Sequence, residues 1–436
     1  MLMIVIIALG GTITPVVGQG LPTLRILVHQ RPRIELVRQM VPMFEAIMMQ
    51  RGRPVKVEIV EGPAPDPEYQ TKLFVDLRAG TGADAFMVRN TFLPSAVEAR
   101  YLLDLTDRLT AWRDWSTQFY PVLRNQVAVG GRIYSVPPGA SVMLLFYRRD
   151  ILQSLGISTA QPKTFDDLLN RAREIRQKSG KFAVLYPAGA QWGGGTFSEG
   201  FLLLMLGTKS PLYNGATGRW VVRSPGLLTV FKIYETLAKE RLLPVDPLLA
   251  PQPWVPTKYR MFTAGDLLIT TSGTWAWDFD WGPNGAAPLP GLFEKVATWE
   301  LPGETEPYVL SIVSWSWAVN AASRQPDLAW EWVKFATSAR GAAMWSGTIG
   351  AIAARRDAKI YAAYATKPHL IAQERSLLRG KFLHPASGID RIAFFAAQAT
   401  DGIITGRMTA DQALDFFARE VTAALGTQAV ESLPMR

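Results

Sequence analysis

The sequence contains no cysteine and only three histidines. Without cysteine the chain cannot form disulfides, use a thiolate nucleophile, bind metal through sulfur or carry the lipid anchor of a lipoprotein. The histidines, His29, His369 and His384, have no metal-ligand spacing between them, so a metal site built on imidazole is not expected. We therefore expect neither a metal nor a cofactor.

Basic residues are in excess, but the sequence has no long basic run. Lys and Arg number 46 against 37 Asp and Glu, which gives a formal net charge of +9. Adjacent basic residues occur only as pairs such as Arg148-Arg149 and Arg355-Arg356, so no stretch is suited to follow a phosphate backbone. We expect a solvated basic surface and no nucleic-acid partner.

The first 18 residues form an apolar stretch that no Lys or Arg precedes. Gly10, Gly11 and Pro15 interrupt it, and small residues at Val16 and Gly18 resemble a cleavage site. This pattern predicts a secretory signal peptide over residues 1–18 and is too short and too broken for a membrane-spanning helix; a buried first strand is the alternative. The protein is therefore predicted to be periplasmic or extracellular and, without cysteine, not anchored through a lipid.

Length and composition favour two lobes. The 436 residues exceed the usual size of one hydrophobic core, and 48% hydrophobic with 19% charged residues is typical of a globular protein. Strand patterns over residues 24–30, 55–60 and 83–88 alternate with helical patterns, which predicts a parallel sheet with crossover helices. The predicted fold class is α/β.

Two later helices begin with the spacing of a capping box. Thr164 precedes Asp167 by three residues, and Thr409 precedes Gln412 by three. Between these helices, residues 308–319 alternate between apolar and polar positions, which predicts one strand.

Motifs for catalysis are weak. Gly193-Gly194-Gly195 lacks the spacing of a dinucleotide loop, residues 207–210 lack the Gly-Lys pair of a phosphate loop, and no serine lies in a nucleophile elbow. Asp278 and Asp280 would share one face of a strand, like the carboxylate pair of a glycoside hydrolase. They are equally well explained as turn residues that bond their own backbone near Gly282.

Tryptophan is abundant, with 14 residues. A sugar ring has an apolar C–H face ringed by hydroxyls, so its site needs flat aromatic faces together with polar groups. Some tryptophans must pack in the core, but several lie at the ends of segments where they are available for a site. These are Trp192, Trp254, Trp275, Trp277, Trp281, Trp315 and Trp317.

The order of several short segments resembles a known family. They include "GGRIYSVPPG", "LLFYRRDIL" and "PKTFDDLL" within residues 130–169, then "FTAGDLLITTSGTWAW", "WAVNAAS", "GAIAARRDA" and "ITGRMTADQAL". In this order they resemble extracellular solute-binding protein family 1, the binding components of carbohydrate ABC importers, and the "SGTWAW" segment is similar to the maltose-binding branch of that family. The resemblance extends over nearly all of the chain after residue 18.

The resemblance implies two α/β lobes joined by a hinge, with the ligand enclosed between them by hinge closure. The N-terminal lobe would comprise residues 21–138 with 304–350, and the C-terminal lobe residues 142–300 with 355–436. The chain would cross between lobes near residues 136–141, 301–303 and 350–354. Pro137-Pro138-Gly139, which by itself is either a turn or a hinge, then becomes a hinge element.

The resemblance also suggests where a sugar stacks. The first tryptophan of the Trp-Ala-Trp segment stacks on sugar in the maltose-binding branch, and its match here is Trp275; Trp277 is then expected to pack in the core. Trp192 is a second candidate for the aromatic face. Around residues 88–91, Ser141 and Ala393-Phe394 the sequence departs from the maltose-binding pattern, which argues against maltose itself.

Polar candidates follow the first and third predicted strands. Because ligands bind at the carboxyl ends of the strands in open α/β sheets, these side chains are expected at the cleft. Ser141 at the crossover and Trp315 near the other strand would complete it, with Arg391 as a further candidate. The candidates at the two strand ends are Gln30, Arg31, Arg89, Asn90 and Thr91.

We therefore predict a monomeric solute-binding protein, not an enzyme, that delivers a carbohydrate or polyol to the membrane permease of an ABC importer. The arginines leave open an anionic ligand such as a glycerol phosphate or an acidic sugar. An alternative of another class is a glycoside hydrolase that uses Asp278 and Asp280.

Overall fold

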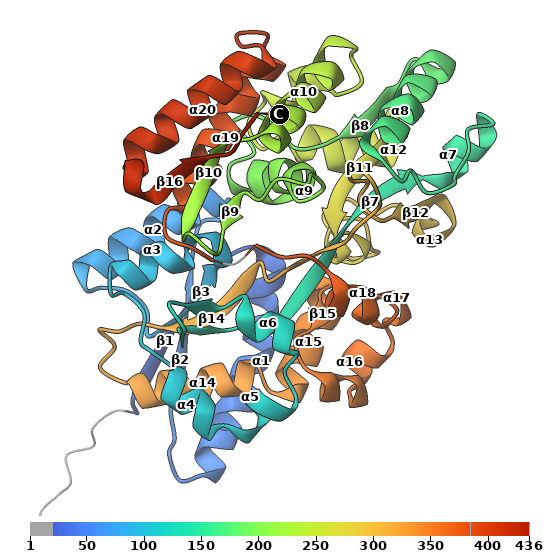
Figure 1. Ribbon diagram of the computed structural model, residues 1–436. Coiled ribbons are helices and arrows are strands. Elements are labelled where there is room, and N and C mark those ends of the chain that lie inside the picture. Colours follow the sequence, from blue (N-terminus) through green and yellow to red (C-terminus); the bar gives the residue numbers. More distant parts are fainter. Residues whose placement is uncertain (1–20, 384, 436) are drawn as a thin grey trace, which may run out of the picture.

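The N-terminal lobe is built around a five-stranded sheet (Figure 1). The computed structural model describes residues 21–435 except residue 384. The strands lie in the order β2 (Lys56–Glu61), β1 (Thr23–Val28), β3 (Ala85–Arg89), β14 (Trp315–Val319) and β6 (Ser135–Val136). Strand β1 is parallel to β2 and β3, and β14 is antiparallel to β3.

Helices α1 (Arg31–Gln50) and α2 (Asp66–Ala79) connect the parallel strands of this sheet. This is the strand-helix alternation that the sequence predicts. The remaining elements of this lobe are η1 (Asn90–Phe92), α3 (Leu93–Glu98), α4 (Thr106–Ala111), α5 (Arg113–Thr117), α6 (Pro121–Asn125), β4 (Ala128–Val129), β5 (Arg132–Ile133), α14 (Pro326–Ala336) and α15 (Ala339–Ile349).

The C-terminal lobe contains two sheets. The larger has the order β12 (Val296–Trp299), β7 (Gly139–Arg148), β11 (Leu267–Gly273) and β8 (Phe182–Leu185), and the smaller has β16 (Val430–Ser432), β10 (Arg219–Arg223) and β9 (Tyr213–Asn214). The helical elements are α7 (Arg149–Ser154), α8 (Phe165–Ser179), η2 (Thr196–Phe201), α9 (Leu202–Met205), α10 (Pro225–Lys239), α11 (Val245–Leu248), η3 (Val255–Met261), α12 (Phe262–Ala264), η4 (Thr274–Trp277), α13 (Leu292–Lys295), α19 (Ile389–Ile404), α20 (Ala410–Leu425) and η6 (Thr427–Ala429).

Strand β7 lies at the crossover between the lobes. It follows the Pro-Pro segment directly and pairs at its start with β15 (Ile352–Ala353) and then with β13 (Leu310–Ile312). The strand predicted over residues 308–319 is in fact two strands: β13 pairs with β7, whereas β14 pairs with β3. The chain therefore passes from one sheet to the other at Val313-Ser314.

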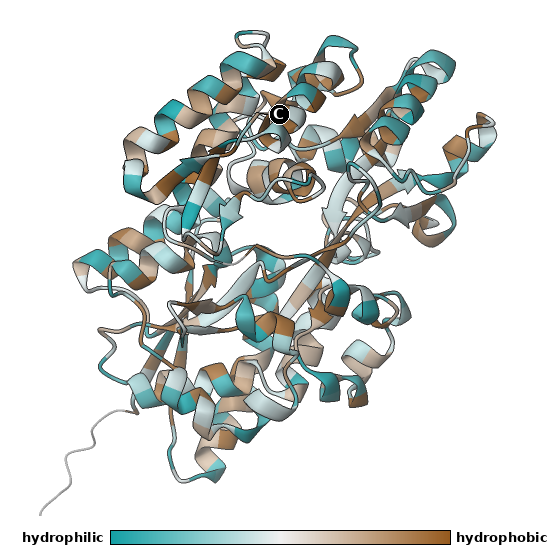
Figure 2. Cartoon of the chain, in the orientation of Figure 1, coloured by the Kyte–Doolittle hydropathy of each residue, from teal (hydrophilic) through white to brown (hydrophobic). Residues whose placement is uncertain are grey.

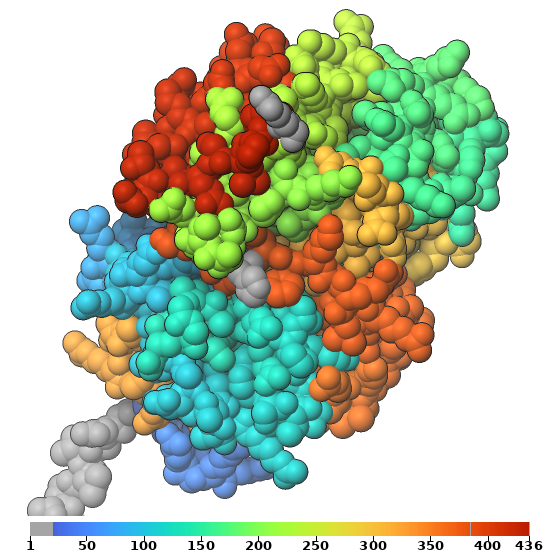
Figure 3. Space-filling model, in the orientation of Figure 1, coloured from blue at the N-terminus to red at the C-terminus, as the bar shows by residue number. Residues whose placement is uncertain are grey.

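The predicted lobe boundaries stay a prediction. One packing contact concerns the segment after residue 355, which was predicted to belong to the C-terminal lobe. The segment η5 (Arg356–Ile360), α16 (Ala362–Ala365) and α17 (Pro368–Ile371) packs through Tyr364 and Leu370 against alanines of α15. Figure 3 shows this orange segment, followed by α18 (Glu374–Arg379), beside the blue and teal N-terminal lobe, with the green and red C-terminal lobe above.

Local sequence signals explain two helices of the C-terminal lobe, α8 and α20. Thr164 and Thr409 both form the predicted capping boxes, with Asp167 and Gln412 as their partners. In α20 the residues Leu414, Phe417 and Val421 are buried, and Figure 2 shows hydrophobic and hydrophilic residues alternating along this helix. Within the described part of the chain no helix is both long enough and apolar enough to cross a membrane. The predicted signal peptide, residues 1–18, lies outside the described residues.

Candidate functional site

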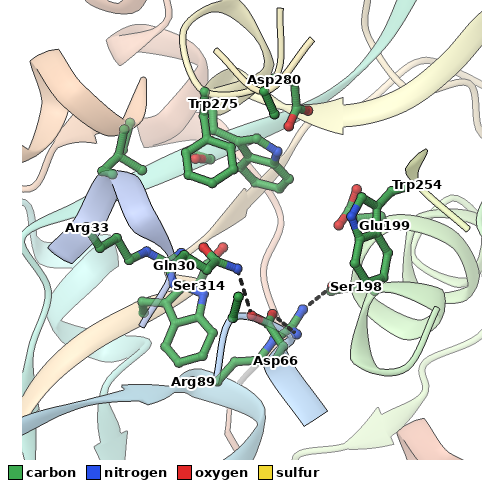
Figure 4. Close-up of a pocket in the computed structure, with 18 of the residues that line it drawn as sticks. Gln30, Arg33, Asp66, Arg89, Ser198, Glu199, Trp254, Trp275, Asp280 and Ser314 are labelled. Atoms are coloured by element: carbon green, nitrogen blue, oxygen red, sulfur yellow. Dashed lines mark hydrogen bonds and ion pairs between the residues drawn. The ribbon is translucent and has the colours of Figure 1, made fainter. Parts of the chain in front are cut away.

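A cavity of about 400 Å³ lies between the lobes and is lined by residues of both. Polar and aromatic side chains share its wall (Figure 4). Small-molecule sites typically measure roughly 300–1,000 Å³ and combine apolar surface with a few placed polar groups, so this cavity suits a small solute. The charged and aromatic lining residues are Arg31, Arg33, Asp66, Arg89, Glu199, Lys258, Asp280, Trp192, Trp254, Tyr259, Trp275, Phe279, Trp315 and Trp345.

Asp66, at the start of α2, organises the N-terminal wall of the cavity. Its carboxylate accepts hydrogen bonds from Gln30 Nε2 at 3.0 Å and Arg89 Nη1 at 2.8 Å, and it lies 2.9 Å from His29 Nε2. Gln30 has a φ of 64°, a left-handed conformation that is uncommon for a residue other than glycine. Backbone strain of this kind concentrates at ligand sites, and here it directs Gln30 toward Asp66.

Burial and neighbouring charges shift the pKa values of three groups on this wall, His29, Asp66 and Arg33. Burial lowers the pKa of His29 to about 4, despite its hydrogen bond to Asp66, so its imidazole is neutral at pH 7. Burial raises the pKa of Asp66, but the His29 hydrogen bond and the Arg89 and Arg33 charges outweigh it and lower that pKa to about 2. Burial lowers the pKa of Arg33 to about 10, and its guanidinium lies 4.6 Å from the ring centre of Trp315.

Trp275 lies on the C-terminal wall, just after the end of β11. The strand ends at Gly273 and the short helix η4 begins, which brings the indole back over that glycine: a Cβ at Gly273 would overlap the six-membered ring. Lys258 Nζ lies 5.9 Å from the ring centre. Trp277, two residues on, is buried and stacks on Phe293 at 5.1 Å between ring centres, so it packs as predicted.

Lys258 forms a buried ionic cluster with Glu199 and Asp280 beside Trp275. Its Nζ lies 3.3 Å from Glu199 Oε2 and 3.1 Å from Asp280 Oδ2, and donates to Ser272 Oγ at 2.7 Å. Burial and the charge of Asp280 raise the pKa of Glu199, whereas the two carboxylates outweigh burial and raise the pKa of Lys258. Tyr259 O–H donates to Asp280 Oδ1 at 3.2 Å.

Arg89 bridges the two walls of the cavity. Arg89 of β3 donates from Nη2 to Ser198 Oγ of η2 at 3.0 Å while Nη1 holds Asp66. A Cβ at Gly194 would lie 3.0 Å from Arg89 Nη1, so the absence of a side chain there lets the guanidinium approach. The central residue of the glycine triplet, which does not fit a dinucleotide loop, thus lies against Arg89.

Of the ten predicted site residues, seven line the cavity and three do not. Arg391 lies exposed near the start of α19, and Asn90 and Thr91 lie in η1 behind the lining. The side-chain oxygens Asn90 Oδ1 and Thr91 Oγ1 are buried without a hydrogen-bond partner among the described residues. The seven that line it are Gln30, Arg31, Arg89, Ser141, Trp192, Trp275 and Trp315.

Sequence reasoning missed the two residues at the centre of the polar walls. Asp66 has a signal that was available, because it is an acidic residue in the first turn of a helix that follows a strand. Lys258 has none, since it lies in a π-helical segment whose position cannot be read from apolar periodicity.

The two aspartates of the glycoside hydrolase alternative face different surroundings. Asp280 lines the cavity and pairs with Lys258, whereas Asp278 is not among the lining residues. Asp278 instead pairs with Lys367 and with His369, whose Nε2 lies 3.0 Å away. A hydrolase needs both carboxyl groups at one bond of the substrate, so this arrangement does not favour that alternative.

The comparisons with known proteins agree with this architecture. Two α/β lobes with a lined cavity at their crossover are the fold of two-lobed solute-binding proteins. A model of the family described as bacterial extracellular solute-binding protein matches residues 39–372. The chain belongs to this family.

Curated relatives cover only part of the chain. The erythritol/L-threitol-binding protein of Mycolicibacterium smegmatis is 25% identical over 326 residues, which are 68% of this chain and 63% of that protein. A probable ABC transporter-binding protein of Deinococcus radiodurans is 25% identical over 251 residues, 55% of each chain. In both cases the match spans less than two thirds of the relative's own length.

Solved structures match over nearly the whole chain. The maltose-bound MalE3 of T. maritima aligns with a TM-score of 0.77 at 20% identity and covers 92% of this chain and 100% of that one. A solute-binding protein of Agrobacterium radiobacter in complex with ribitol aligns with a TM-score of 0.75 at 18% identity, covering 93% and 99%. At these identities the likeness establishes the fold alone.

Proposed function

We propose that this protein binds a small carbohydrate or polyol in the interlobe cavity and delivers it to the permease of an ABC importer. The observation that carries the proposal is the pairing of an aromatic face, Trp275, with hydrogen-bonding groups on the opposite wall, Gln30 and Arg89 (Figure 4). Stacking on a C–H face together with bonds to hydroxyls is the chemistry that a sugar or polyol requires. The named ligands of the relatives, erythritol, L-threitol, ribitol and maltose, have this chemistry.

The charge balance favours a neutral ligand over an anionic one. Arg89 is already engaged by Asp66 and Ser198, and Arg33 by the face of Trp315. Arg31, the remaining arginine of the lining, is exposed at the start of α1, and an anion would also meet the carboxylates of the opposite wall. We therefore assign Gln30, Arg31, Arg89, Ser141, Trp192, Trp275 and Trp315 to the binding of a neutral solute.

We further propose that the protein acts outside the cytoplasm, as a monomer and without catalysis. The family description supports the location, and a signal peptide at residues 1–18 would direct export. Closure of the two lobes on each other would enclose the ligand and create the surface that a permease recognises.

A thermal-shift screen of the purified protein tests the function. The panel contains maltose, ribitol, erythritol, L-threitol and other neutral sugars and polyols, with glycerol phosphate and acidic sugars as the anionic arm. A ligand that binds only the folded state raises the melting temperature, and calorimetry then gives its Kd. Hits confined to the anionic arm, or no hits in either arm, contradict the proposal.

A further inference from the structure

Two irregular helical segments place a buried ionic cluster at the edge of the cavity. Glu199 lies in η2 and Lys258 in η3, and both segments are π-helical. Such segments are rare and are frequently found at functional sites. Asp280 comes from the turn after η4, so three separate parts of the chain meet at one point. Of the three residues, only Asp280 was singled out from the sequence.

Within this cluster almost every hydrogen-bonding position is used. The ammonium of Lys258 has three acceptors, Glu199 Oε2, Asp280 Oδ2 and Ser272 Oγ. An ammonium group has three N–H donors, so Lys258 has none left for a ligand. Asp280 is 2% exposed, and both of its oxygens have partners, Tyr259 on one side and Lys258 with Ser272 on the other.

Glu199 is the exception. Its Oε2 pairs with Lys258, but its Oε1 accepts no hydrogen bond from any residue within the described ranges, although the side chain lines the cavity (Figure 4). The backbone is held in place, because Thr271 Oγ1 of β11 donates to the Glu199 carbonyl at 2.5 Å. A rigidly held carboxylate oxygen without a partner in a ligand cavity is an acceptor for the ligand.

We propose that Glu199 is a specificity-determining residue that accepts a hydrogen bond from a hydroxyl of a solute stacked on Trp275. This rests on the proposed function and deepens it, because it sets the chemistry of one end of the ligand. The end that faces Glu199 carries a hydroxyl donor. A carboxylate or phosphate at that end is rejected, since it has no hydrogen to donate and repels a carboxylate whose paired lysine is fully engaged.

The test compares Kd values by calorimetry for Glu199→Gln, Glu199→Asp and Glu235→Gln. The last is a matched control, because Glu235 is paired with Lys239 on α10 and does not line the cavity. Lys258 keeps Asp280 as a counterion in Glu199→Gln, so that variant retains a balanced pair. The probes are ribitol with ribonate and maltose with maltobionate, whichever neutral member binds the wild type.

We expect Glu199→Gln to raise the Kd of the neutral ligand by about tenfold, because a charge-assisted hydrogen bond becomes a neutral one. The ratio of the Kd for the acid to the Kd for the neutral ligand should also become smaller. Glu199→Asp keeps the charge but withdraws the oxygen, so it should lose affinity while it still rejects the acid. Glu235→Gln should behave as wild type. Melting temperatures check that each variant is folded.

The failures are distinguishable. If no neutral sugar or polyol binds the wild type, the proposed function falls and this inference with it. If a neutral ligand binds and Glu199→Gln has the wild-type Kd, the inference alone is refuted. A weaker Kd in Glu199→Gln with an unchanged preference over the acid would assign Glu199 a structural role and likewise refute the inference.

Discussion

Replacing Trp275 tests the centre of the proposed site. A sugar or polyol covers one face of the indole, roughly a third of the ~200 Å² that a tryptophan buries. At about 25 cal/mol per Å², burial of this area is worth about 1.7 kcal/mol, and we take roughly 1 to 3 kcal/mol as the range for the loss of the indole. Trp275→Ala should therefore raise Kd between about 5-fold and 150-fold.

Calorimetry with the best ligand of the thermal-shift screen measures this change. Trp277→Phe is the matched control, because Trp277 is only two residues away but packs against Phe146 and Phe293 outside the cavity lining. That variant should leave Kd unchanged, although it can lower the melting temperature. The assignment of Trp275 is refuted if Trp275→Ala binds the ligand with the Kd of the wild type.

A second variant perturbs the indole without removing it. Gly273 has a φ of −89° and a ψ of 174°, which alanine adopts freely, but a Cβ there would overlap the ring of Trp275. Gly273→Ala should thus displace the indole and weaken binding although every lining side chain is retained. An unchanged Kd would mean that the orientation of Trp275 does not matter for the ligand.

Three further predictions concern closure and stability. Ser198→Ala removes the hydrogen bond that Arg89 donates across the cleft, which is worth about 1.5 kcal/mol. Small-angle scattering of the ligand-free variant should therefore show a shift toward the open form. An unchanged scattering curve would contradict this prediction. Burial lowers the pKa of His29 from about 6.5 in the unfolded chain to about 4 in the folded protein. The free energy of unfolding should therefore fall by about 3 kcal/mol as the pH drops from 6.5 to 4. His29→Gln should flatten this dependence in urea titrations. Thr164→Ala removes a capping box and should cost about 1 kcal/mol in the same assay, with no change in Kd.

The capped helices and the first three strands were predictable because their signals are local. The capping boxes at Thr164 and Thr409 are read from four consecutive residues, and the structure confirms both. The position of Trp275 at the end of β11 was likewise accessible from its segment. By contrast, alternation over residues 308–319 predicts a strand but does not indicate which sheet the strand joins. The change of sheet at Val313-Ser314 is therefore not predicted by this pattern.

The polar walls were only partly predictable because they are assembled over long distances in the sequence. Arg89 follows a strand that the sequence marks clearly, and it lines the cavity. Asp280 was expected to be a turn residue and is instead buried, because Lys258, 22 residues earlier, supplies its counterion. No pattern within either segment points to the other, so only the folded chain reveals the pair.

The distribution of charge between the walls links binding to closure. On the N-terminal wall Asp66 pairs with Arg89 and also faces the charge of Arg33, which leaves an excess of positive charge. On the C-terminal wall Lys258 is shared by two carboxylates, which leaves an excess of negative charge. Closure brings the two excesses together, and their attraction strengthens as water leaves the cleft. A neutral solute preserves this attraction, since it accepts bonds from one wall and donates to the other, whereas an anion would cancel it.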